Sequence, residues 1–189
     1  MAGFGFAGRR SFYKWINTIF NKVDNHRIKE VGPDRAAAEW LLRCGASVKW
    51  KDQKCWVSDY NSLEVNTKLQ HVIEDIDATE SCIMNEGFHY FNGLNNLRKI
   101  KFRRCIYLDD TCIHKLTETD VKNSLQHLEI ISCGNITDNG VLGVTKFKNL
   151  KKLHLFDLPE VNRECLCVLI KSLPDCDIDF PEKKSSNDV

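Results

Sequence analysis

The chain of 189 residues contains six histidines and several adjacent carboxylates, the residue types from which acid–base and metal sites are built. The histidines are scattered without metal-ligand spacing, and His127 and His154 fall in segments whose pattern predicts strands, where a surface histidine is ordinary. Asp109 and Asp110 stand where a turn or a helix cap favours a carboxylate. The sequence also lacks GxSxG, HExxH, CxxC and a glycine-rich phosphate loop. We therefore expect no enzymatic activity.

Nine cysteines form the other reactive set, but their number is odd and no pair has zinc-finger spacing. Cysteine is among the most frequently buried residues when it is free, and disulfides are rare in reducing compartments. We expect buried free thiols at the positions in apolar surroundings: Cys44, Cys82, Cys105, Cys133, Cys165 and Cys176.

A repeat of apolar residues must position these side chains. Its clearest copy, residues 125–138, has apolar residues at its first, fourth and sixth positions and Cys133 at its ninth. Further copies begin at Leu97 and Leu150, a weaker one at Ile73, and a closing fragment at Leu173. Each copy predicts a short strand, a turn and a helical return. The fold class is thus α/β: a leucine-rich-repeat solenoid of about four repeats, with short parallel strands on its concave face and helices on its convex face.

The return segments show helical spacing over residues 110–116, 137–144 and 162–173, and we expect Asp110 and Thr137 to cap the first two. In the strands, alternate residues point to opposite faces. Lys99, Lys101 and Arg103 should therefore project together onto the concave surface. We expect these three cations to contact a protein partner; the alternative is a solvated face without one.

The first 23 residues are basic, aromatic and free of acidic residues. Residues 1–11 predict a mitochondrial targeting segment, with a frayed basic terminus as the alternative. From Phe12 onward an apolar stripe has helical spacing and could be core packing or an interfacial helix. We expect Phe12 and Trp15 to dock on a membrane or its embedded subunits, and Ile19 and Phe20 to pack on the N-terminal domain.

Residues 12–70 predict an N-terminal capping domain of helices and a hairpin. A helix starts at Pro33 and ends at Gly45, and residues 48–50 and 55–57 alternate like paired strands. The polar stretch 59–70 marks the boundary to the repeat domain, 71–180, and the polar tail 181–189 predicts disorder. No apolar run approaches the ~18 residues that span a bilayer, and the net charge of +1 gives no general argument for nucleic-acid binding.

Several motifs resemble those of mitochondrial factor B, the family also called ATP synthase subunit s or distal membrane arm assembly component 2-like. They are FNKVD at residues 20–24, VGPDRAA at 31–37, EWLLRCGA at 39–46, IDAT at 76–79 and EIISCGNITD at 129–138. The likeness runs from about Phe12 to Leu173. It implies a non-catalytic coupling protein on the matrix side of the inner mitochondrial membrane, held peripherally and in contact with the membrane sector of ATP synthase.

The resemblance also implies a magnesium ion held by the main-chain carbonyls of Gly45 and Thr79, with water filling the other positions. A helix end presents free carbonyls, and the lack of charged ligands implies weak affinity. The family's Cys-x-Cys pair is not retained, because Arg103 replaces its first cysteine and leaves Cys105 alone. Two other functions stay open: assembly of the membrane arm of respiratory complex I, and substrate recruitment for a ubiquitin ligase.

Overall fold

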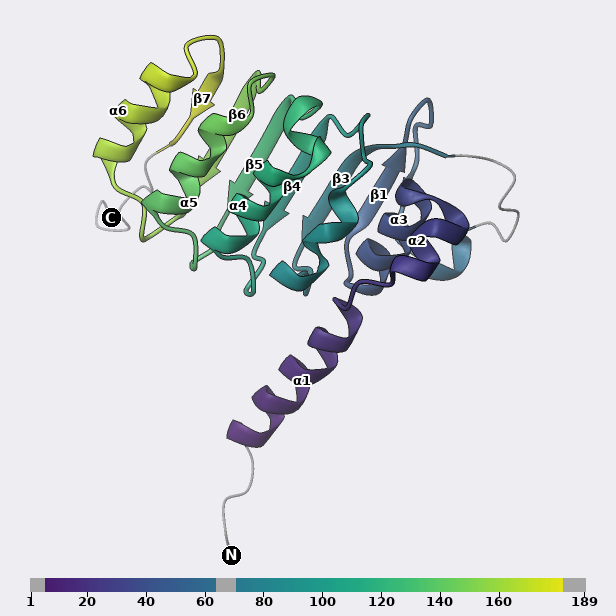
Figure 1. Cartoon of the computed structure of the whole chain (residues 1–189). Helices are drawn as coiled ribbons and strands as arrows, with labels where there is room; N and C mark the ends of the chain where they lie inside the picture. The colour runs from purple at the N-terminus through teal and green to yellow at the C-terminus, as the bar shows by residue number, and fades with distance from the viewer. Residues whose placement is uncertain (1–5, 64–70, 182–189) are drawn as a thin grey trace, which may run out of the picture.

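The computed structural model describes residues 6–63 and 71–181, with side chains from Tyr13 onward. Within them a seven-stranded sheet has the order β2-β1-β3-β4-β5-β6-β7 (Figure 1). The strands from β3 to β7 are parallel, and each begins one copy of the repeat. They span Ile73–Thr79, Lys99–Arg103, His127–Ile131, Lys152–Phe156 and Asp177–Asp179. The predicted strands are confirmed.

The parallel strands stack so that equivalent repeat positions lie side by side. Two buried rows cross the sheet on its helix-covered face. Burying each large aliphatic side chain contributes roughly 1.5 to 3 kcal/mol, so these rows hold the solenoid together. The first contains Ile76, Ile100, Leu128 and Leu153, and the second contains Ala78, Phe102, Ile130 and Leu155.

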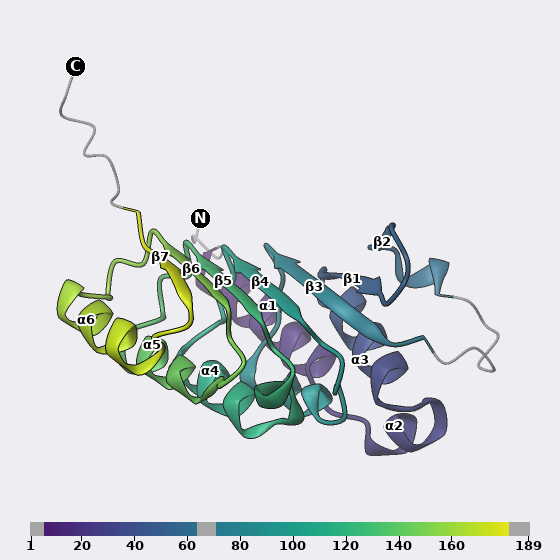
Figure 2. The same cartoon turned by 90° about the horizontal axis from the view of Figure 1, so that it is seen from above.

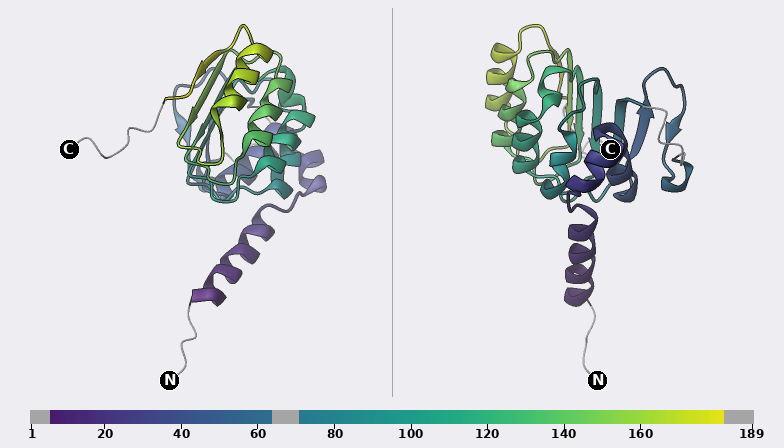
Figure 3. Two further views of the ribbon diagram at one scale, coloured as in Figure 1. Left: turned by 90° about the vertical axis from the view of Figure 1, so that its left-hand side faces the viewer. Right: turned by 45° about the vertical axis from the view of Figure 1, so that its right-hand side comes forward.

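The return segments cover one face of the sheet (Figure 2). After β3 the chain forms a 3₁₀ helix, η2 (Asn85–Phe91), and the following repeats form α4 (Asp110–Glu118), α5 (Asp138–Gly143) and α6 (Arg163–Ser172). Short 3₁₀ helices η3 (Asp120–Asn123) and η4 (Val144–Lys146) follow α4 and α5. The opposite face, which we call the open face, carries no helix over β3 to β7, as the side view in Figure 3 also shows.

The prediction that Asp110 caps α4 is wrong, whereas Thr137 does cap α5. The cap of α4 is Asp109, whose Oδ1 accepts a hydrogen bond from the amide of Cys112 at 3.1 Å. Asp110 instead accepts hydrogen bonds from the amide and hydroxyl of Thr137, at 2.9 and 2.6 Å. One aspartate therefore begins a helix while its neighbour joins that helix to the next repeat.

The N-terminal part adds α2 (Asn25–Val31), α3 (Pro33–Arg43) and a hairpin of β1 (Ser47–Trp50) and β2 (Trp56–Val57). Helix α3 ends as predicted, with Gly45 at φ 82°. The amides of Gly45 and Ala46 donate to Leu42 and Leu41, the pattern in which a left-handed glycine closes a helix. Strand β1 pairs antiparallel with β3, so the hairpin and the repeats share one sheet across the predicted boundary at 59–70. Residues 64–70 lie outside the described part.

Helix α1 (Phe6–Phe20) projects from the body near the lower ends of the strands in Figure 1. It overlaps the predicted targeting segment, of which residues 1–5 lie outside the described part. Of the predicted tail 181–189, only Pro181 is described. None of the described helices combines the length and the apolar character needed to cross a membrane.

Candidate partner-binding surfaces

The open face of the sheet is formed by three rows of side chains, which its register places side by side. The first row, running from β1 to β7, is Lys49, Asp75, Lys99, His127, Lys152 and Asp177. The second, from β3 to β7, is Asp77, Lys101, Glu129, His154 and Asp179. The third, from β3 to β6, is Thr79, Arg103, Ile131 and Phe156. The first two rows are polar throughout, and the third combines an exposed arginine with two half-buried apolar residues.

Lys99, Lys101 and Arg103 share this face, while Ile100 and Phe102 are buried behind it, as the alternation predicts. Lys99 Nζ lies 2.6 Å from a carboxylate oxygen of Glu129 on β5, and Lys101 Nζ lies 3.1 Å from Asp77 on β3. Both ammonium groups are thus already neutralised within the sheet. Arg103 is exposed and makes no ion pair with a described residue. The binding role of the three cations stays a prediction.

Asp77 organises the β3 side of the open face. Its carboxylate accepts hydrogen bonds from the amide and hydroxyl of Thr79, at 3.0 and 2.5 Å, and one from Lys101. Burial opposes ionisation of this carboxyl, but the hydrogen bonds outweigh it and lower the pKa of Asp77 below its usual value. Hydrogen bonds from Thr79 and Lys101 therefore favour the ionised form of Asp77.

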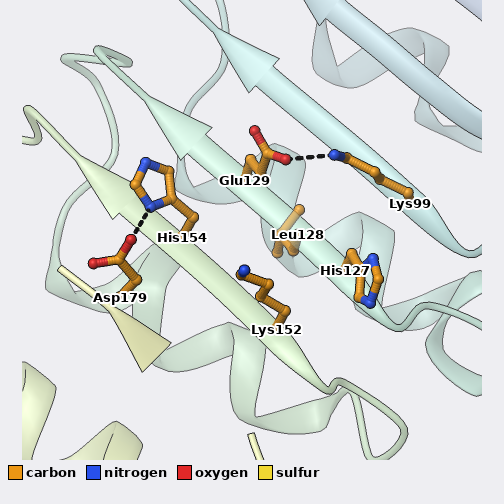
Figure 4. A pocket seen from close by; sticks show the side chains of 7 residues that line it. All are labelled: Lys99, His127, Leu128, Glu129, Lys152, His154 and Asp179. Carbon is orange, nitrogen blue, oxygen red and sulfur yellow. Dashed lines mark hydrogen bonds and ion pairs between the residues drawn. The ribbon is translucent and has the colours of Figure 1, made fainter. Parts of the chain in front are cut away.

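A hollow of about 370 Å³ lies on the open face over β4 to β7 (Figure 4). The second row contributes the hydrogen bond between His154 Nδ1 and Asp179, at 2.8 Å. The Lys99–Glu129 pair crosses from the first row to the second on the other side of the hollow. Lys152, His127 and Leu128 complete the lining, and neither Lys152 nor His127 makes an ion pair with a described residue. The sequence predicted Lys99 as a partner contact and His127 and His154 as ordinary surface histidines of strands.

A second surface is the outward side of α1. Three of its large apolar side chains are exposed: Trp15 by 60%, Ile19 by 50% and Phe20 by 39%. The expectation that Ile19 and Phe20 pack on the N-terminal domain is therefore wrong. The body covers these side chains only in part, and Ile19 lines a shallow hollow with Glu86 and His89 of η2 and Lys115 of α4. Trp15 is exposed as docking requires, and the side chain of Phe12 lies outside the described part.

One side of α1 faces the repeats. Tyr13 and Asn17 line a shallow hollow together with Glu80, Arg104 and Tyr107, which follow β3 and β4. The apolar stripe of an ordinary surface helix covers the core. In α1 the half-buried residues are Ile16 and Asn17, whereas Trp15, Ile19 and Phe20 are exposed, so the body leaves most of the large apolar side chains of the helix uncovered.

The predicted magnesium ligands lie near the end of the antiparallel ladder of β1 and β3. Its last pair is Ser47 and Asp77, and Gly45 precedes Ser47 by two residues while Thr79 follows Asp77 by two. A magnesium site at these two carbonyls stays a prediction. The carbonyl of Gly45 accepts no hydrogen bond from a described residue, and the space beside its Cα is open. Oxygen donors with room for water fit a hard cation. No group of three or more His, Cys, Asp or Glu side chains in the described residues offers an alternative metal site.

All nine cysteines are free, and those at Cys44, Cys105, Cys112, Cys133 and Cys165 are buried. Cys82 and Cys176 are only partly buried, so the prediction of buried thiols is wrong for these two. Cys105 Sγ donates to the carbonyl of Ala78 at 2.7 Å and lies 3.5 Å from the hydroxyl of Ser81, the equivalent residue of the preceding repeat. Its neighbour Cys133 has a raised pKa, because of its hydrogen bond with Cys105 and its burial. The repeat cysteines thus satisfy buried backbone groups as thiols.

Sequence reasoning missed a row of residues with left-handed backbone that follow successive strands: Glu80, Arg104, Ser132 and Asp157, with φ between 52° and 56°. Each turns the chain from its strand toward the return segment. Their side chains also pair across repeats, Arg104 with Glu80 at 3.0 Å and Ser132 with Asp157 at 2.9 Å. Glycine or asparagine would mark such turns, but none of the four residues is either, so only their spacing could have revealed them.

No family model matches the chain. Curated relatives do match it over most of its length. It is 49% identical over 172 residues to ATP synthase subunit s, mitochondrial, of Rattus norvegicus, covering 89% of this chain and 86% of that one. The Homo sapiens protein of the same name is 47% identical over 156 residues, covering 82% and 78%. Distal membrane arm assembly component 2 of Drosophila melanogaster is 25% identical over 162 residues, covering 80% and 56%.

Among solved structures, the crystal structure of the yeast Rad7 and Elc1 complex is similar to 60% of this chain and 30% of the matched chain, with a TM-score of 0.47 and 24% identity. The relatives named ATP synthase subunit s share nearly half of the aligned residues with this chain and leave little of either chain unmatched. The chain belongs to the family of mitochondrial ATP synthase subunit s.

Proposed function

We propose that the chain is a non-catalytic coupling component of mitochondrial ATP synthase, which contacts the membrane sector of the enzyme and supports proton-driven ATP synthesis. The observation that carries this proposal is its identity of 47 to 49% with proteins named ATP synthase subunit s. Its place would be the matrix side of the inner membrane, where it would be held peripherally.

The shape of the chain supports this role. Helix α1 presents Trp15, Ile19 and Phe20 outward, and the sequence around them is basic without an acidic residue from Phe6 to Val23. Such a helix suits an interface with membrane-embedded subunits and the anionic lipid around them. Arg103 ends β4, and the next residue, Arg104, lines the hollow beside α1. The arginine and the aromatic helix therefore lie at one edge of the molecule, where a single partner could meet both.

A second candidate is assembly of the membrane arm of respiratory complex I. The 25% identity to distal membrane arm assembly component 2 favours it. Depletion of the protein from mitochondria, followed by native gels and assays of proton-driven ATP synthesis, separates the two. The first proposal predicts impaired synthesis with fully assembled complex I, restored by adding back the chain. Accumulation of incomplete complex I with normal ATP synthesis would support the second candidate instead.

We also propose that Gly45 and Thr79 bind a magnesium ion weakly through their carbonyl oxygens. Support comes from the ladder of β1 and β3, which ends at Ser47 and Asp77, two residues from each ligand, and from the open space at Gly45. When bound, the ion would fix the end of α3 against the end of β3. Magnesium should then raise the melting temperature in a saturable way at millimolar concentration, and no saturable rise would count against the site.

A further inference from the structure

We infer that the hollow on the open face binds an acidic side chain of an extended peptide segment from a protein partner, through Lys152 and His127. This inference deepens the proposed function by naming the chemistry of a contact. It also moves the contact from the β4 lysines to the β5–β6 part of the sheet.

Two side chains of the hollow are acidic, and both already have a partner. Glu129 lies 2.6 Å from Lys99, and Asp179 lies 2.8 Å from His154. These two carboxylates are the acidic side chains of the hollow, and each already has a nitrogen partner within 3 Å, the ammonium of Lys99 or the imidazole of His154 (Figure 4). They are therefore poorly placed to neutralise a further cation.

Lys152 also lines the hollow, and no described residue neutralises its positive charge. It is exposed, and its ammonium makes no ion pair or hydrogen bond with a described residue. In the first row its neighbours are His127 on β5 and Asp177 on β7, and no ion pair joins it to Asp177. The hollow thus offers one ammonium and one imidazole as donors, a set that suits a single carboxylate.

The same features disfavour phosphate. Phosphate groups are best recognised by the two-pronged guanidinium of arginine, and the residues lining this hollow include none. A phosphate dianion would also meet the carboxylates of Glu129 and Asp179 at close range. A carboxylate carries half that charge, and a peptide that bears it can donate its amide hydrogens to the same two carboxylates.

The third row extends the site with an apolar surface. Ile131 and Phe156 are half-buried neighbours that follow Glu129 and His154 by two residues on the same face. The His154 ring stacks on Phe156 with centroids 6.5 Å apart and planes 14° apart. Alternate side chains of an extended peptide are spaced like alternate residues of these strands. Phe156 follows Lys152 by four residues and Ile131 follows His127 by four, so a peptide with an acidic residue at Lys152 and His127 would place the residue four positions away on this apolar pair.

The test uses the full chain, ¹⁵N-labelled, and the probe acetyl-Glu-Ala-Ala-Ala-Leu-amide, followed by amide chemical shifts. We expect saturable shifts over β5 and β6, and an affinity about tenfold lower for acetyl-Gln-Ala-Ala-Ala-Leu-amide, since a charge-assisted hydrogen bond is lost. Lys152→Gln should weaken binding of the acidic probe by about tenfold. Glu129→Gln should strengthen it severalfold, because it frees Lys99. Lys122→Gln, a matched change at an exposed lysine of η3, should leave binding unchanged.

Equal binding of the two peptides would overturn the inference, and so would unchanged binding by Lys152→Gln. Inorganic phosphate that binds the same residues as tightly as the acidic probe would overturn the assignment to an acidic peptide. The titration requires no ATP synthase, so its failure would leave the proposed function standing. Failure of the chain to associate with the synthase would likewise leave the titration result intact.

Discussion

The side chain of Asn21 accepts a hydrogen bond from the indole Nε1 of Trp40 at 3.1 Å, and its Oδ1 also accepts one from the amide of Met84 at 2.8 Å. Its own amide nitrogen donates to the carbonyls of Asn17 and Cys82, at 2.8 and 2.9 Å. One fully buried residue at the end of α1 thus joins the helix to α3 and to the first repeat.

Asn21→Ala should remove this junction. The change leaves the buried donors of Trp40 and Met84 without acceptors, so we expect the free energy of unfolding to fall by about 2 to 4 kcal/mol. Urea titration followed by tryptophan fluorescence measures it. Asn25→Ala, at an exposed residue of α2, is the control and should change stability by less than about 0.5 kcal/mol. A loss from Asn21→Ala no larger than that of the control would contradict the junction.

The outward face of α1 predicts a separation of stability from attachment. A Trp15→Ala/Ile19→Ala variant removes two exposed side chains, so its melting temperature should stay within a few degrees of the unaltered chain. Its recovery with inner-membrane vesicles in sedimentation should fall severalfold, since the docking surface is lost. A large drop in melting temperature with unchanged sedimentation would show that α1 is part of the core.

Charge reversal should lower the free energy of unfolding more at Lys101 than at Arg103. Arg103 makes no ion pair with a described residue, so Arg103→Glu should change the free energy of unfolding by less than about 0.5 kcal/mol. Lys101→Glu places a carboxylate beside Asp77, where the ammonium now lies at 3.1 Å, and should cost about 1 kcal/mol at low salt. Denaturant titrations at two salt concentrations test this difference. Equal losses at both positions would mean that the Lys101–Asp77 pair contributes nothing.

Thiol labelling should follow burial. The thiolate is the reactive form, so a raised pKa slows alkylation at any pH below it. Burial raises the pKa of Cys165 to about 11 and raises that of Cys112 further, whereas Cys55 and Cys167 are exposed. In the folded chain, maleimide at pH 7.5 should modify Cys55 and Cys167 first, as read by peptide mass spectrometry. Rapid modification of Cys112 without unfolding would contradict its buried position.

The sequence allowed the strands and most of the helices of the repeats to be predicted, because apolar spacing reports directly which residues face the core. It was less informative about contacts between repeats. Lys101 reaches Asp77 24 residues earlier and Lys99 reaches Glu129 30 residues later, and both pairs depend on how neighbouring strands stack. The contacts of Asn21 could not be predicted either, since no local sequence pattern marks a buried amide that joins three segments. Ile19 and Phe20 were misplaced because a helical stripe shows amphipathicity without showing how much of the helix the body covers.

The most direct test of the account is purification of the tagged full-length chain from mitochondria in mild detergent, with quantitative mass spectrometry of the proteins that accompany it. Membership of the subunit s family and the proposed coupling role predict that ATP synthase subunits, including those of the membrane sector, are enriched above all other complexes. Recovery of complex I membrane-arm intermediates, or of cytosolic proteins, without ATP synthase would contradict it.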